Sequence, residues 1–498
     1  MGSSQKIFSG VVWTTALNVV NAVYGFISVP ILLSYFGKSQ YGLIGLATSI
    51  NAYMQLMDMG LGTTSLRFFS VSLAKKEFDI TKKTFQTSLS FYTFVGILNA
   101  LILFVISIFS SEIFNVTESQ DLILKDLFYI LIFSAILGWF SSSFDQLIRS
   151  TENVAWIQER TLFAKFCQIL ILAATVLFKL DIVTYFALTS LAVVSIILPL
   201  SIKKIRSILP FISFRPKLYK NIFMSILPYS LNLFSFSIFQ FSFYNLRSVF
   251  IGMQGNVGSI VDFNIMGGIA SAVNMFSGAF LGSLLPSTSK AMALNNKGAF
   301  YRVAYDGTKY ISIILCFCSF GCLAVCKDLL SLYVGEKYLY LIPWLCLWLL
   351  TALGNHNQAI SSLILSSDDV RPISYSSVAA SVIGLLASWF LIPYFQAGGA
   401  VIGYCLYMMV QLTFYYLYYW PKRMNISSKK ILSYSFGPYV LIGLISSLLC
   451  IYLPIHLGHF LRLLILGILF SAVYILVSYI TLTDKDKSFI RSLINLKL

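Results

Sequence analysis

The chain has 498 residues, of which 58% are hydrophobic and 11% are charged. Soluble domains are about 45–50% apolar and about 25% charged, so this composition excludes a soluble globular protein and indicates a polytopic membrane protein. The formal net charge of +16 would suggest a nucleic-acid partner in a soluble chain, but here the basic residues lie in loops between apolar runs, which favours membrane topology and no nucleic acid.

Apolar runs of about 20 residues are long enough to cross the hydrocarbon core of a bilayer as single helices. Isolated strands cannot satisfy their backbone groups in lipid, so every crossing is expected to be helical. The segment before the first run has neither the length nor the cleavage site of a secretory signal, so that run is expected to stay in the membrane. We therefore predict an all-α polytopic membrane protein with about fourteen transmembrane helices, at residues 8–36, 41–70, 84–111, 122–148, 157–178, 183–202, 221–250, 259–288, 306–334, 340–365, 373–394, 397–420, 431–454 and 460–482.

Basic residues are concentrated in alternate loops of this arrangement. Cytoplasmic loops carry an excess of lysine and arginine, so these loops and both termini are predicted to be cytoplasmic. The clusters are Lys75, Lys76, Lys82 and Lys83; Lys203, Lys204, Arg206, Arg215, Lys217 and Lys220; Lys290, Lys297 and Arg302; and Lys422, Arg423, Lys429 and Lys430.

One stretch near the start of the chain places polar and charged residues inside apolar sequence. It reads YFGKSQYGLIGLATS at residues 35–49 and DMGLGTTSLR at residues 58–67. This pattern resembles the amino-terminal signature of bacterial polysaccharide exporters, LG…YG…S…DLGL…S..R. Length, segment count and loop charge are also similar along the chain to the O-antigen flippase family of the multidrug/oligosaccharidyl-lipid/polysaccharide superfamily. The resemblance implies a transporter of the bacterial inner membrane.

The longest basic loop, at residues 203–220, follows the sixth predicted helix. We therefore predict two six-helix bundles, at residues 1–206 and 207–420, followed by two additional helices and a cytoplasmic tail in residues 421–498. The resemblance implies that the two bundles enclose a central cavity. Parallel repeats of this kind are a known transporter plan.

Charged residues inside the predicted helices need a physical reason, because each costs about 2.5–3.5 kcal/mol near a helix centre. Asp58 lies near the middle of the second helix and Arg67 about two turns before its basic loop. Arg67 either extends to the membrane interface or binds substrate, and the family signature has an arginine at the matching place. Asp58 either caps the chain locally or titrates during transport.

The fourth and fifth helices carry further charges. Asp145 and Arg149 are four residues apart and share one helix face, so they form either a structural ion pair or a site where a diphosphate competes with Asp145 for Arg149. Lys165 lies about two turns inward from the start of the fifth helix, and its ammonium group is expected to reach back to the interface.

Arg247 lies near the outer end of the seventh helix, where no basic cluster surrounds it. Positive-inside topology does not account for it, so it is the leading single candidate for a residue that faces the cavity. Family members are often acidic near this place, and Arg247 departs from that pattern. Asp262 in the next helix is a candidate partner for Arg247.

The ninth and tenth helices contain two more polar groups. Asp306 and Lys309 are three residues apart on one face and form a candidate pair. Asn355, His356 and Asn357 interrupt an apolar run near mid-helix, which suggests a water-lined path. His356 either titrates near its ordinary pKa of about 6.5 or is a buried, neutral, hydrogen-bonded histidine.

The leading hypothesis is a flippase for polyprenyl (undecaprenyl)-diphosphate-linked oligosaccharide repeat units of O-antigen or capsule. Cationic side chains suit diphosphate oxygens. The predicted substrate residues are Arg67, Arg149, Arg247, Lys309, Asn355 and Asn357. A proton or sodium gradient would act through Asp58, Asp145, Asp262, Asp306 or His356. No cofactor or metal is expected, since the sequence contains no Walker-type loop and no paired metal-ligand spacing.

Three alternatives stay open. A cation-coupled multidrug exporter of the same superfamily would need a cavity dominated by carboxylates. A flippase for a lipid-linked peptidoglycan precursor uses similar chemistry. A membrane polysaccharide polymerase or ligase requires a large soluble loop, which this chain lacks, so a transporter rather than an enzyme is expected. Besides the phospholipid bilayer, the resemblance implies a polysaccharide polymerase and a chain-length regulator as partners.

Overall fold

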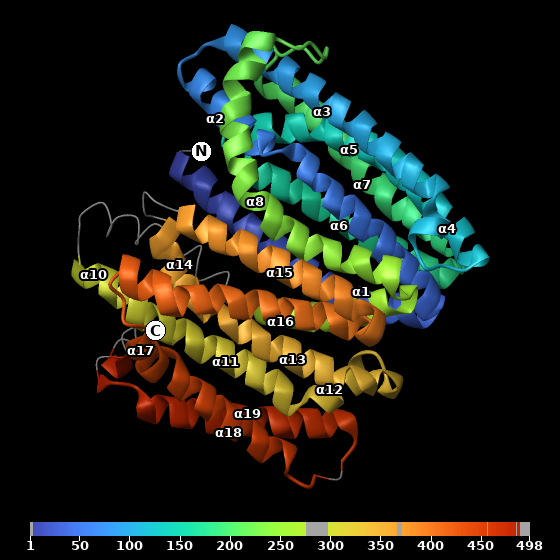
Figure 1. Ribbon diagram of the computed structural model, residues 1–498. Helices are drawn as coiled ribbons and strands as arrows, with labels where there is room; N and C mark the ends of the chain where they lie inside the picture. The colour runs from blue at the N-terminus through green and yellow to red at the C-terminus, as the bar shows by residue number, and fades with distance from the viewer. Residues whose placement is uncertain (1–2, 275–296, 366–370, 456, 485, 489–498) are drawn as a thin grey trace. The chain divides into compact units, whose positions relative to one another are not determined.

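A computed structural model describes residues 3–274, 297–365, 371–455, 457–484 and 486–488 (Figure 1). All the regular elements in these ranges are helical. Eleven helices among the described residues are long and apolar enough to cross a membrane. The predicted class of all-α polytopic membrane protein is therefore confirmed, and the count of fourteen helices stays a prediction.

Contacts between residues divide the chain into two compact units. Unit 1 comprises Met1–Phe263 and Ile392–Ala397, and unit 2 comprises Asn264–Leu391 and Gly398–Leu498. Each unit is described by itself below. The predicted bundle boundaries at residues 206 and 420, and the central cavity, stay predictions.

Helix α1 (Ser3–Met54) covers the first predicted crossing and most of the second. Its regular conformation is interrupted at Gly37, where φ is 75° and ψ is 169°. A side chain is strained at a positive φ, so glycine suits this position. The break falls in the gap between the helices predicted at residues 8–36 and 41–70, and it divides α1 into two helical segments. After η1 (Gln55–Asp58), two successive left-handed residues, Met59 and Gly60, precede α2 (Leu61–Ala74).

The other helices of unit 1 follow α2 in chain order. They are α3 (Phe78–Ile108), α4 (Ser110–Ile113), α5 (Glu118–Ser150), α6 (Val154–Phe178), α7 (Ile182–Ile208) and α8 (Lys220–Gln254), followed by helical residues 257–263. The local sequence determines where helix α7 begins. Asp181 accepts hydrogen bonds at 3.0 Å from the backbone N–H groups of Val183 and Thr184 and so caps α7. The Thr184 hydroxyl, which donates to the same carboxylate at 2.6 Å, lowers the pKa of Asp181 together with these backbone donors.

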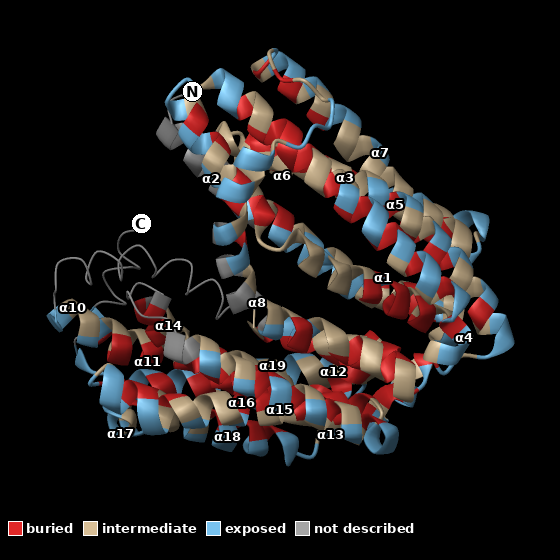
Figure 2. Cartoon of the chain, turned by 45° about the horizontal axis from the view of Figure 1, so that its top comes forward, coloured by how far each residue is buried: buried red, intermediate tan, exposed pale blue. Residues whose placement is uncertain are grey.

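The core of unit 1 lies where α2, α3, α5 and α7 meet. Phe69, Phe85 and Phe144 are completely buried there, and the rings of Phe85 and Phe144 meet edge to face with centroids 5.3 Å apart. Figure 2 shows buried residues on the facing sides of α3 and α5, with exposed residues on their outer sides. This pattern leaves apolar side chains outward, as expected of helices in lipid.

Unit 2 contains shorter helical segments. They are α10 (Lys297–Arg302), η2 (Val303–Gly307), α11 (Thr308–Ala324), α12 (Cys326–Tyr333), η3 (Glu336–Leu341), α13 (Ile342–Ala352), η4 (Leu353–Asn357), α14 (Gln358–Leu365), most of α15 (Arg371–Phe395), α16 (Ala397–Phe414), η5 (Tyr415–Arg423), α17 (Ser428–Lys430), η6 (Ile431–Phe436), α18 (Gly437–Ile451) and α19 (His459–Thr481). Three of these, η2, η5 and η6, are π-helical turns around one aromatic core that includes Tyr305, Tyr415 and Trp420. Such wide turns are rare in proteins and interrupt regular α-helix.

Candidate functional site

The two charges of the second predicted helix have different surroundings. Asp58 accepts a hydrogen bond at 2.5 Å from the Tyr92 hydroxyl and one at 3.2 Å from the backbone N–H of Gly62. It therefore holds the start of α2 against α3, which matches the local-cap interpretation. Arg67 is exposed and lines a pocket of about 440 Å³ that also includes Glu77 and Ser225.

Asp145 pairs with Arg160 of the next helix rather than with Arg149. Both terminal guanidinium nitrogens of Arg160 donate to the carboxylate at 3.0 Å, and Arg160 also donates to the Ser201 hydroxyl. Arg160 is only 4% exposed, so this bidentate pair joins α5, α6 and α7 inside the bundle. The expected pair between Asp145 and Arg149 is a wrong prediction. The competing partner lies across a helix–helix contact, which spacing within one helix cannot reveal.

Arg247 is packed among aromatic rings. It is 3% exposed, its Nε donates to the Phe243 carbonyl at 3.2 Å, and its guanidinium carbon lies 5.2 Å from the centroid of the Phe263 ring. Asp262 forms an ion pair at 2.7 Å with Lys38, which follows the Gly37 break. Lys38 falls between the predicted helices at residues 8–36 and 41–70, so this pair was not predicted.

Lys309 is fully buried in unit 2, with 1% of its surface exposed. Its ammonium group donates to Asp486 at 2.6 Å and to the Tyr434 hydroxyl at 2.8 Å, whereas Asp306 lies 4.0 Å away. Tyr310 also donates to Asp486, at 2.7 Å. The main partner of Lys309 is therefore Asp486 rather than the expected Asp306.

Asp486 lies beyond the last candidate span and its ionisation is strongly favoured. Burial alone would raise the pKa of this carboxyl, but hydrogen bonds from Lys309, Thr483 and Tyr310 and the charge of Lys309 outweigh burial and lower the pKa to about 2. Asp486 is therefore the ionised partner of the buried lysine at neutral pH.

His356 matches the interpretation of a buried, hydrogen-bonded histidine. Its ring nitrogens lie 2.9 Å from the Leu353 carbonyl and 2.6 Å from the Tyr416 hydroxyl, and its ring stacks on Phe436 at 3.9 Å. Asn355 donates to the side chain of Asn274 at 2.8 Å, and Asn357 is buried. These side chains hold helices of unit 2 together.

A polar cavity lies inside unit 1, between α1, α5, α6 and α7, with a volume of about 500 Å³. All four helices are candidate membrane spans, and polar groups inside such spans are costly and commonly functional. The polar side chains that line this cavity, hereafter the polar cavity, are Tyr24, Thr48, Asn51, Gln55, Ser134, Ser142, Lys165, Gln168, Tyr185, Thr189 and Ser190.

Lys165 is the one cation among the lining residues, and none of them is a carboxylate. Its ammonium group lies 4.5 Å from the centroid of the Tyr24 ring. Tyr24 and Tyr185 bring their hydroxyls to 3.5 Å, and Gln168 donates to the Thr189 carbonyl at 3.4 Å. Among the described residues, Lys165 forms no ion pair, so the polar cavity carries an uncompensated positive charge.

From the sequence, Lys165 was expected to reach the interface, and this cavity was not predicted. Two spacings point to it in retrospect. Asn51 on α1 and Gln55 at the start of η1 are four residues apart, and Lys165 and Gln168 are three residues apart on α6, so each pair shares one face in a continuous helical stretch. Which faces meet is decided by packing between α1 and α6, and the sequence contains no direct signal for it.

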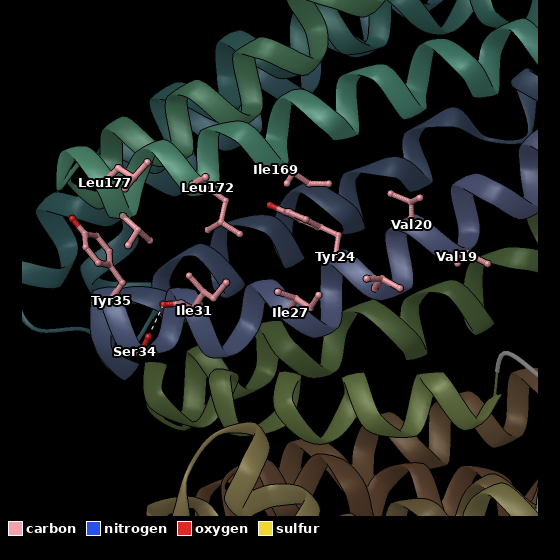
Figure 3. A pocket seen from close by; sticks show the side chains of 13 residues that line it. Val19, Val20, Tyr24, Ile27, Ile31, Ser34, Tyr35, Ile169, Leu172 and Leu177 are labelled. Carbon is pink, nitrogen blue, oxygen red and sulfur yellow. Dashed lines mark hydrogen bonds between the residues drawn. The ribbon is translucent and has the colours of Figure 1, made fainter. Parts of the chain in front are cut away.

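An apolar groove lies next to the polar cavity, between α1 and α6, with a volume of about 980 Å³. Figure 3 shows side chains of both helices facing this space, with Tyr24 reaching from α1 toward α6. Tyr24 lines both the groove and the polar cavity. Together they offer a cation, hydroxyl and amide groups beside an apolar surface, which suits an anionic amphiphile.

No protein-family model and no curated protein matches this sequence. Solved structures share its fold. The lipid II flippase MurJ, in an inward closed conformation, has a TM-score of 0.71 and 13% identity, and the match covers 97% of this chain and 100% of that chain. An inward-facing multidrug resistance MATE family transporter of the MOP superfamily has a TM-score of 0.61 and 13% identity, covering 82% and 96%. The MATE multidrug transporter DinF-BH has a TM-score of 0.53 and 16% identity, covering 83% and 96%.

At these identities the similarity shows the fold alone. The chain has the fold of MurJ and the MATE transporters, as the resemblance to the superfamily implied. The O-antigen branch of that superfamily stays a prediction.

Proposed function

We propose that this protein is a flippase that moves a polyprenyl-diphosphate-linked oligosaccharide between the leaflets of a bacterial inner membrane by alternating access. The observation that carries the proposal is the polar cavity of unit 1, which combines one uncompensated lysine with hydroxyl and amide groups between four candidate membrane spans. The fold that the chain shares with MurJ, a lipid II flippase, supports the same class of activity. The proposed direction is from the cytoplasmic to the periplasmic leaflet, with both termini cytoplasmic.

The cavity chemistry suits this substrate class. An ammonium group binds phosphate oxygens as a point charge, and Lys165 has no carboxylate among its neighbours in the cavity to compete with a diphosphate. Asn51, Gln55 and Gln168 supply donors and acceptors for sugar hydroxyls. Its volume of about 500 Å³ lies within the usual range of ligand pockets. Arg67, exposed on α2, and Arg149 at the end of α5 are proposed contacts on the cytoplasmic approach.

The other predicted residues take different roles in the proposal. Lys309 and Arg247 are buried and engaged with protein groups, so neither is proposed to bind the head group in this conformation. A proton or sodium gradient is the proposed energy source, with Asp58, Asp145, Asp262, Asp306 and His356 as the residues to test. A polysaccharide polymerase and a chain-length regulator are the proposed partners.

A cation-coupled multidrug exporter is the second candidate, because the MATE transporters share the fold. A positively charged cavity repels cationic drugs and attracts anionic head groups. Lys165 therefore favours the flippase. A flippase for a peptidoglycan precursor shares this cavity chemistry, and comparison of the two lipid-linked saccharides separates these candidates.

The test is transport in proteoliposomes that contain a polyprenyl-diphosphate-linked oligosaccharide, followed by its appearance in the opposite leaflet. We expect Lys165→Met to slow transport about tenfold or more, because a hydrogen bond to a charged group contributes about 1.5–3 kcal/mol. Lys165→Arg should retain much of the activity. Lys203→Met is the matched control, since Lys203 is exposed and lies outside the cavity.

Two outcomes would contradict the proposal. One is transport by Lys165→Met at the wild-type rate while the control also remains active. The other is a wild-type protein that moves no lipid-linked saccharide but exports a cationic dye, which would favour the second candidate.

A further inference from the structure

The groove between α1 and α6 is built from two apolar stripes. Val19, Val23 and Ile27 follow one another at four-residue spacing on α1, and Ile169 and Val176 lie on the facing side of α6. Val19, Val23 and Ile27 are each 48–51% exposed, so the groove is open along its length. Residues 19 to 35 of α1 extend over roughly 24 Å, which is most of the thickness of a hydrocarbon core.

The polar atoms along this groove are already engaged. The Ser34 hydroxyl donates to the Ile31 carbonyl of its own helix at 2.9 Å, and the Tyr35 hydroxyl donates to the Leu180 carbonyl at 3.2 Å. Tyr35 thus lies at the end of the groove nearest the α6–α7 loop. The groove offers no strong polar contact of its own, and a hydrocarbon chain is its matching occupant.

Tyr24 connects the groove to the polar cavity. One side chain lines both spaces, and its ring lies 4.5 Å from the ammonium group of Lys165. A head group bound at Lys165 therefore lies beside the groove, at the level of Tyr24. A chain attached to that head group needs an apolar exit from the cavity, and the groove adjoins the cavity at this shared side chain.

We infer that the α1/α6 groove holds the polyprenyl chain of the lipid-linked substrate while its diphosphate lies at Lys165. This inference rests on the proposed function and adds the surface that binds the chain. The charge of Lys165 supports an anionic amphiphile over a neutral lipid, and the shared Tyr24 supports a single molecule that occupies both spaces.

The groove does not act by withdrawing the chain from water, because the surrounding lipid is equally apolar. It acts by shape: it lets the chain remain beside the protein while the head group occupies the cavity. Blocking the groove should therefore separate the chain from its head-group site without changing the cavity itself.

The test uses groove-filling variants on each helix, Val23→Trp and Ala173→Trp. Leu170→Trp is the matched control, because Leu170 is a 54% exposed residue of α6 that does not line the groove. Transport in proteoliposomes is measured for two lipids with the same diphosphate-linked disaccharide, one with a long polyprenyl chain and one with a short chain that ends near Tyr24. Monodispersity in size-exclusion chromatography selects the variants that fold.

We expect each groove variant to slow transport of the long-chain lipid about tenfold, the size of the Lys165 effect, because both changes remove the same head-group contact. The short-chain lipid should be moved at nearly the wild-type rate. Combining Ala173→Trp with Lys165→Met should add little to either change alone, since interacting sites are non-additive.

Cross-linking gives an independent measure of occupancy. A diazirine at the end of the long chain should label peptides of α1 or α6 in wild type and lose that labelling in Ala173→Trp. Equal labelling by a diazirine phospholipid would mean that an ordinary bilayer lipid occupies the groove, and would overturn the inference.

The two hypotheses fail in distinguishable ways. If wild type transports the long-chain lipid and both groove variants match it while Lys165→Met does not, the groove assignment alone is wrong. If wild type moves neither lipid, the proposed function is wrong and the groove assignment falls with it.

Discussion

Arg160 and Lys165 lie five residues apart on α6 and have opposite electrostatic surroundings. Arg160 is held by the carboxylate of Asp145, whereas Lys165 faces the ring of Tyr24. A neutralised charge inside a bundle holds helices together, and an uncompensated one keeps its capacity for a ligand. Both side chains are cations on the same helix, and the partner that each one meets distinguishes their roles.

The contribution of the Asp486 carboxylate to stability can be tested through its dependence on pH, again at the scale of single residues. Its pKa in the folded protein is about 2, below the ordinary value of 3.8, so it stabilises the fold above that ordinary value and loses this contribution as the pH falls toward 2. Asp486→Asn should cost about 3 kcal/mol at neutral pH, because it leaves the buried Lys309 charge without its main partner.

The measurement is the apparent Tm in detergent as a function of pH. The difference between wild type and Asp486→Asn should be full at neutral pH and should narrow between about pH 4 and pH 2. Asp484→Asn, at an exposed neighbouring position, is the control and should match wild type throughout. A difference that does not change with pH would show that the carboxylate charge is not responsible.

At the scale of elements, close approach of backbones fixes α1 within unit 1. A Cβ at Gly42 would meet the carbonyl oxygen of Val257, a backbone atom that cannot move aside. A Cβ at Gly25, on the same helix, would meet nothing within 4 Å. The two glycines therefore make a matched pair that separates packing from helix propensity.

We expect Gly42→Ala to destabilise the protein by about 2 kcal/mol or more, through overpacking against the Val257 backbone. Gly25→Ala should be neutral or stabilising by up to about 1 kcal/mol, because alanine favours helix over glycine. Thermal unfolding of both variants beside wild type checks the prediction. Equal effects of the two substitutions would mean that the contact at Val257 does not limit the packing of α1.

Most of the helices could be predicted from the sequence, but the contacts between them could not. Long apolar runs identify helices, and the Gly37 turn was predicted because glycine and polar residues interrupt such a run. The break at Met59 and Gly60 was not predicted, since residues 41–70 were predicted to form one continuous helix. Arg160, Asp486 and Lys38 were missed as partners because each ion pair joins residues from different helices or segments, and spacing along one helix carries no signal for that.

At the scale of the whole molecule, the membrane topology stays a prediction that cysteine labelling can test. Basic loops predict that Lys76 is cytoplasmic and that Lys179 lies on the opposite side. In a background without the native cysteines, Lys76→Cys should react with an impermeant maleimide only in inverted vesicles. Lys179→Cys should react only in right-side-out vesicles. Labelling of both from one side would overturn the topology, and permeabilised vesicles show that both sites can react.

The pairing of Lys309 with Asp486 also sets an order of events during biosynthesis. The two residues are 177 positions apart, so at about 5–20 residues per second the ribosome needs roughly 9–35 s to make the second after the first. During that interval α11 has already been synthesised and its lysine lacks its strongest partner. The helix can reach its final buried position only after the segment beyond α19 has been translated, so completion of the C-terminal helices and burial of Lys309 are coupled in time.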